Sequence, residues 1–124
     1  MTSQQPDTVL ACNLQAIPLE LRPAHQANVQ RIFASVQEVQ ELSTGYAVRL
    51  PNETDLLQTV MAFISYERLC CPFFHFGLEI EPQQGPVWLS ISGTTDVKFF
   101  IQSEEWFPAS ASASQPPQRI VTPS

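Results

Sequence analysis

The sequence predicts an α+β domain built as a two-layer sandwich, in which an antiparallel sheet of four to five strands carries helices on one face. Segments with alternating apolar and polar residues occur in two pairs, and a short turn sequence separates the members of each pair, which is typical of β-hairpins. Segments with apolar residues at three- and four-residue steps lie before, between and after these pairs. The expected element order is therefore (β)-α-β-β-α-β-β-α.

The first half of the chain contains a helix and a hairpin. Apolar residues within 18–34 have helical spacing, and we expect the regular helix to begin after Arg22, because a proline at the next position is tolerated only in an opening turn. Residues 36–50 predict a hairpin that turns near Gly45. The short apolar run at residues 8–12 is either an additional strand or an anchored N-terminal arm.

The second half repeats this order. Residues 51–55 offer a capping side chain and acidic groups, which favour the start of a helix. Apolar residues then recur at helical spacing as far as Cys71, and Pro72 ends the helix there because the residue before a proline avoids helical geometry. Residues 74–92 predict the second hairpin, and Thr94 can cap a short final helix.

The chain divides into one domain and two terminal segments. Residues 8–104 form the predicted α+β domain, and 44% hydrophobic positions in 124 residues suffice for one core. Residues 1–7 are expected to be a flexible N-terminus. Residues 105–124 are rich in alanine, serine and proline, so we expect a disordered tail.

Charge and hydropathy exclude several classes of partner. With 6 basic and 12 acidic residues, the chain has a net charge of −6 and no basic stripe, so nucleic acid and anionic membranes are not expected partners. The N-terminal residues have neither the positive start nor the apolar run of a signal peptide, and no stretch is long enough to span a membrane. We therefore expect a cytoplasmic location.

Two adjacent cysteines, Cys70 and Cys71, lie where the second helix should end, and the remaining cysteine is Cys12. Because three is an odd number and a cytoplasmic location is expected, free thiols are favoured over disulfides. Thiolates prefer soft ions, so these residues are a candidate site for mercury, copper(I), zinc or a metalloid such as arsenite. The alternative is that they pack in the core as small apolar side chains.

Three further side chains are candidates to complete such a site. A zinc ion prefers four ligands, so Glu67, His25, His75 or water would have to join the three sulfurs. Glu67 precedes the cysteines by one helical turn and either accepts a thiol hydrogen bond or pairs with a basic neighbour. His25 can equally be a surface residue, and strand alternation places His75 on the face away from the core.

The sequence does not favour an enzyme. A Gly-rich phosphate loop, a Gly-x-Ser-x-Gly elbow, a His-Glu-x-x-His motif and a Cys-x-x-Cys pair are all missing. The cysteine pair also lies at the C-terminus of a helix, whose partial negative charge disfavours a reactive thiolate. The alternative to ion binding is a structural or protein-interaction module, which could form a homodimer through an uncovered sheet face.

Some residues carry a resemblance to a known family. Cys12, Tyr46 after a turn, and the segment Glu67-Arg68-Leu69-Cys70-Cys71-Pro72-Phe73 followed by Phe76 resemble a family of small, uncharacterised bacterial proteins. Those proteins share an early cysteine and a Glu-Arg-x-Cys-Cys-Pro-Phe segment, and they are associated with heavy-metal resistance genes, particularly those for mercury. The resemblance extends over about residues 10–101 in element order, and it implies a metal-associated role for the three cysteines.

Overall fold

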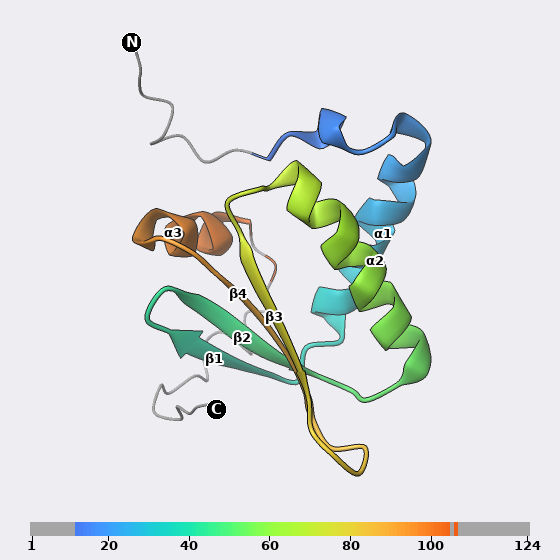
Figure 1. Cartoon of the computed structure of the whole chain (residues 1–124), viewed down its shortest axis with the longest axis vertical. Coiled ribbons are helices and arrows are strands. Elements are labelled where there is room, and N and C mark those ends of the chain that lie inside the picture. The colour runs from blue at the N-terminus through green and yellow to red at the C-terminus, as the bar shows by residue number, and fades with distance from the viewer. Residues whose placement is uncertain (1–11, 105, 107–124) are drawn as a thin grey trace.

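The computed structural model describes residues 12–104 and Trp106. These residues form a four-stranded antiparallel sheet with the strand order β1-β2-β4-β3, together with three α-helices (Figure 1). The predicted α+β class and element order are thereby confirmed. The sequence left open a first strand at residues 8–12. Residues 8–11 lie outside the described part of the chain, and Cys12 is not in a strand.

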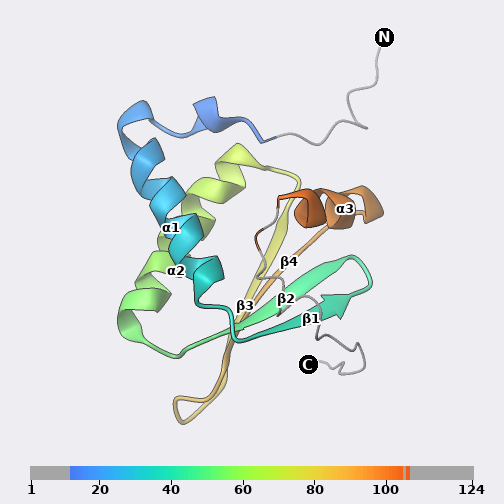
Figure 2. The same cartoon turned by 180° about the vertical axis from the view of Figure 1, so that it is seen from behind.

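The elements follow one another with short connections. In chain order they are η2 (Leu14–Ala16), η3 (Leu19–Leu21), α1 (Arg22–Ala34), β1 (Glu38–Leu42), β2 (Gly45–Leu50), α2 (Thr54–Cys70), β3 (His75–Ile80), β4 (Val87–Ser92) and α3 (Thr95–Ser103). Figures 1 and 2 show α1 and α2 packed beside each other, with α3 at the end of the sheet near the C-terminus of α2. The two hairpins, β1–β2 and β3–β4, meet where β2 pairs with β4.

All three helices lie on one face of the sheet, as predicted. The register pairs Val48 with Leu89, and these side chains are 2% and 0% exposed and belong to the same buried cluster as Phe63 of α2. Helix α3 reaches the same face, since Nε2 of Gln102 donates a hydrogen bond to the hydroxyl of Tyr46 at 2.5 Å. Burial alternates strictly along β4, whereas four consecutive residues of β2, from Gly45 to Val48, are buried.

Helix α2 ends where the sequence predicts, and its end positions the cysteines. Cys70 is its last residue, and the N–H of Cys71 still donates to the carbonyl of Glu67 at 2.7 Å. At Cys71 the backbone leaves helical geometry, with φ −126° and ψ 77°, because Pro72 follows. The chain then turns within three residues into β3, and both cysteines are buried at the end of the helix.

Gly45 allows the two hairpins to come together. A Cβ atom at this position would overlap the carbonyl oxygen of Ile91 on the paired strand β4. Glycine is therefore required by close backbone approach, and not by a positive φ.

Trp106 extends the packed domain beyond α3. Its ring stacks on Phe33 with centroids 4.8 Å apart and meets Phe63 and Phe74 edge-on. The predicted tail had included this residue. Residues 1–11, 105 and 107–124 lie outside the described part, so the flexible N-terminus and the disordered tail stay predictions. Among the described helices, none combines the length and apolar character needed to cross a membrane.

Candidate functional site

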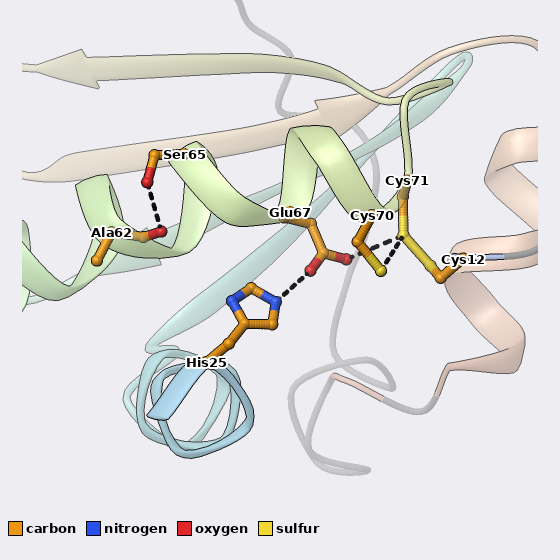
Figure 3. A network of polar contacts seen from close by, with 7 residues as sticks. All are labelled: Cys12, His25, Ala62, Ser65, Glu67, Cys70 and Cys71. Atoms are coloured by element: carbon orange, nitrogen blue, oxygen red, sulfur yellow. Dashed lines mark hydrogen bonds and ion pairs between the residues drawn. A yellow bond between two sulfur atoms is a disulfide. The ribbon is translucent and has the colours of Figure 1, made fainter. Parts of the chain in front are cut away.

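Three sulfur atoms converge at the C-terminus of α2. The Sγ atoms of Cys12, Cys70 and Cys71 all lie within 4.8 Å of one another (Figure 3). Cys12 and Cys71 form a disulfide across 59 positions of sequence, and Sγ of Cys70 lies 3.8 Å from Sγ of Cys71. The N-terminal segment thus delivers its sulfur to the adjacent pair, which the local sequence could not show.

Backbone contacts hold Cys12 at this place independently of the disulfide. The N–H of Asn13 donates to the carbonyl of Cys70 at 2.7 Å, and this satisfies one of the carbonyls that the last helical turn leaves unpaired. Ile17 is fully buried, and Nε of Arg22 donates to its carbonyl at 3.0 Å. The segment that leads into α1 is therefore anchored at two points beyond the sulfur bridge.

The expectation of free thiols is wrong for Cys12 and Cys71. Their Cα atoms are 4.6 Å apart, which lies in the range for disulfides, and a bond joins their sulfurs. An odd number of cysteines excludes complete pairing but not one bridge, and only spatial proximity decides which two residues pair. Cys70 keeps its free thiol.

Cys70 is buried in a negatively charged environment. Its side chain is 3% exposed, and burial is the main cause that raises its pKa above the ordinary thiol value. The carboxylates of Glu67 and Glu104 add to this increase, whereas the backbone N–H of Asn13 acts in the opposite direction. At neutral pH the free cysteine is therefore a protonated thiol.

Glu67 connects the sulfur cluster to α1. One carboxylate oxygen, Oε2, lies 3.3 Å from Sγ of Cys71, and the other, Oε1, lies 2.7 Å from Nε2 of His25 (Figure 3). Its side chain is only 4% exposed. The expected pairing of Glu67 with a basic residue is therefore present. The expected thiol hydrogen bond is not shown by the contact with Cys71, because a disulfide sulfur has no proton to donate.

His25 is neither a surface residue nor near enough to join the sulfurs. It is 5% exposed, and its ring lies nearly parallel to that of Phe63 with centroids 6.0 Å apart. Nδ1 has no hydrogen-bond partner among the described residues, while Nε2 faces Glu67. His25 therefore supports the site through the carboxylate.

His75 lies apart from the cluster. It is the first residue of β3, is exposed, and points away from the helices as strand alternation predicts. Within residues 12–104 and 106, only the three cysteines form a group that could hold a metal ion. Glu67, His25 and His75 are not part of this group, so a fourth ligand for zinc would have to be water.

Comparison with protein-family models, with curated proteins and with solved structures gives no match. What the site can do therefore follows from its chemistry. With the disulfide closed, one protonated thiol remains and chelation is impossible. The structure, with its disulfide closed, places the three sulfurs within 4.8 Å, close to the roughly 4.6 Å that separates two thiolates on opposite sides of one ion at a metal–sulfur distance near 2.3 Å. Reduction of the disulfide would therefore provide three neighbouring thiols.

Proposed function

We propose that the protein in its reduced state binds a soft metal ion or a metalloid through the thiolates of Cys12, Cys70 and Cys71. One observation carries the proposal: three sulfurs from two distant segments converge within 4.8 Å. Packing alone needs no such convergence, because a buried cysteine behaves as an ordinary small apolar side chain.

The ligand chemistry selects the class of ion. Thiolates favour soft and borderline ions such as copper(I), mercury(II) and zinc, and they disfavour calcium and magnesium, which prefer oxygen. The resemblance to proteins associated with heavy-metal resistance supports the same class. We propose a cytoplasmic location as well, because thiol reductants there keep cysteines in the form that binds metals.

The anchored N-terminal segment supports binding after reduction. The hydrogen bond from Asn13 to Cys70 and the burial of Ile17 do not depend on the disulfide. Cys12 therefore stays beside α2 when the bridge opens, and little ordering is needed to bring the three sulfurs to one ion.

Direct titration tests this proposal. Reduced protein, kept anaerobic, is titrated with mercury(II), arsenite, copper(I) and zinc, and native mass spectrometry counts the bound ions. We expect one ion per chain together with protection of three thiols from alkylation. Cys70→Ser should leave two protected thiols and weaker binding, and the triple Cys→Ser variant should bind none of the four. Equal uptake by the triple variant and the reduced wild type would contradict the proposal.

A second candidate is a structural or interaction module in which the cysteines stabilise the fold. The disulfide favours it, because the bridge ties the N-terminal segment to α2, and Cys70 is buried within the same apolar cluster. In that case Cys70→Ala costs only about 1–3 kcal/mol of stability, as expected for a small core truncation. Sedimentation of the same variant would show whether a homodimer forms and whether it survives the change.

A further inference from the structure

The residues of the sulfur cluster differ in their access to solvent. Cys71 is 0% exposed and Cys70 3%, whereas Cys12 is only partly buried. Thiol–disulfide exchange begins with attack by a thiolate on one sulfur of the bridge, and access decides which sulfur is attacked. A thiol that arrives from solvent therefore meets the two ends of this disulfide unequally.

We propose that Cys12 is a reversible S-thiolation site, at which a low-molecular-weight thiol opens the Cys12–Cys71 disulfide. The protein would then switch between a closed state with one thiol and an open state with three. The exchange itself is independent of metal binding. Its consequence rests on the proposed function, because only the open state has the full set of sulfur ligands.

The exchange balances in two steps. An external thiolate attacks Sγ of Cys12 and forms a mixed disulfide, while the bond to Cys71 breaks and its electron pair leaves on the Cys71 sulfur, which takes up a proton. A second external thiolate then attacks the outer sulfur of the mixed disulfide and releases Cys12. Two external thiols become one disulfide, and the protein disulfide becomes two thiols. The reverse sequence, driven by the external disulfide, closes the bridge again.

Cys70 is not expected to intervene. Its Sγ lies 3.8 Å from Sγ of Cys71, but a bond between these two adjacent residues would require a strained turn. The third sulfur therefore stays available as a ligand while the other two exchange.

The anchored segment makes the switch reversible. Because Asn13 and Ile17 hold the N-terminal segment on the domain in either state, the freed sulfurs of Cys12 and Cys71 remain neighbours. Re-formation of the bridge is then an intramolecular reaction at high effective concentration.

Trapping the intermediate tests the proposal on the wild-type chain. The oxidised protein is treated with limiting reduced glutathione, quenched with acid, and mapped by peptide mass spectrometry. We expect the glutathionyl adduct on Cys12, with at least about tenfold less on Cys71, because access governs the attack. An adduct mainly on Cys71 or Cys70, or equal amounts on Cys12 and Cys71, would overturn the proposal. So would a bridge that resists glutathione in the folded protein but not in urea.

Two single variants provide a matched comparison. With oxidised glutathione, reduced Cys71→Ser should be modified on Cys12 at least about tenfold faster than reduced Cys12→Ser is modified on Cys71. In the trapping experiment, Cys70→Ser should carry the glutathionyl adduct on Cys12, as the wild type does. An adduct on another residue would argue against the proposal.

A final comparison separates this inference from metal binding. If glutathione modifies Cys12 but the reduced protein takes up no ion, S-thiolation stands and the proposed function fails. If the reduced protein binds ions through its three thiols but glutathione neither opens the bridge nor modifies Cys12 in the folded protein, the proposed function stands and S-thiolation is refuted.

Discussion

Glu67 and His25 face each other across the interface between α1 and α2, with Oε1 and Nε2 separated by 2.7 Å. Their side chains are 4% and 5% exposed, so the pair is almost entirely withdrawn from water. The same carboxylate contacts the sulfur of Cys71 through its other oxygen. One buried acidic group therefore joins the helix pair to the sulfur cluster.

Removal of either partner should destabilise the fold strongly. Glu67→Ala and His25→Ala should each lower the free energy of unfolding of the oxidised protein by about 3 kcal/mol, because each leaves the other buried group without its partner. The double variant should cost less than the sum of the two. Urea unfolding measures these differences, with exposed Glu79→Ala as a control expected within about 0.5 kcal/mol of wild type. Additive effects would show that the pair is not coupled.

The disulfide should contribute substantially to stability. Closing a loop across 59 positions lowers the entropy of the unfolded chain by an amount worth about 4 kcal/mol at 25 °C. We therefore expect the free energy of unfolding, measured with urea, to be about 2–4 kcal/mol higher for the oxidised protein than for the reduced protein. The reductant should have no effect on Cys12→Ser. A reductant effect of equal size in that variant would assign the change to another cause.

The free thiol should make stability fall at alkaline pH. Because the pKa of Cys70 is raised in the folded protein, the folded state binds the proton more tightly than the unfolded chain does. The resulting stabilisation is complete below the ordinary thiol pKa of about 8.5 and disappears as pH rises through the folded-state value.

The measurement is the unfolding free energy of oxidised wild type minus that of oxidised Cys70→Ala between pH 7 and pH 10. Above about pH 8.5 this difference should fall by up to about 1.4 kcal/mol per pH unit. A constant difference would mean that the thiol ionises alike in both states.

Trp106 should stabilise the domain from beyond the last helix. Trp106→Ala removes the stacking on Phe33 and should cost about 2 kcal/mol, less than for a fully buried aromatic residue because Trp106 is partly exposed. Trp106→Phe should lose less than half as much stability as Trp106→Ala, since a smaller ring can still stack on Phe33. Thermal unfolding of both variants tests the contribution, and an unchanged midpoint for Trp106→Ala would refute it.

Much of the fold could be predicted from local patterns. The apolar spacing of Leu56, Val60 and Phe63 predicted α2, and all three residues are buried on its inner side. Pro72 predicted the end of that helix through its steric effect on the preceding residue. Alternation predicted the strands and the exposed position of His75.

The candidate site was predictable only in its components. Cys70 and Cys71 stood out as a pair, and Glu67 stood one helical turn before them, but nothing local indicated that His25 would be buried against that carboxylate. Trp106 followed the last predicted helix and gave no periodic signal that would place it on Phe33. Such contacts depend on how α1 and α2 pack, and short-range spacing does not encode that arrangement.

The sequence by itself determined the α+β class, the order of the elements and the three cysteines as the residues with distinctive chemistry, because periodicity, capping and turn residues act over a few positions. Only the tertiary structure decided that Cys12 bonds to Cys71, that Cys70 remains a thiol and that Glu67 lies between His25 and the sulfurs. The physical reason is distance along the chain: a disulfide or a buried hydrogen bond between side chains forms between groups that packing brings together, and 59 positions separate the two bonded cysteines.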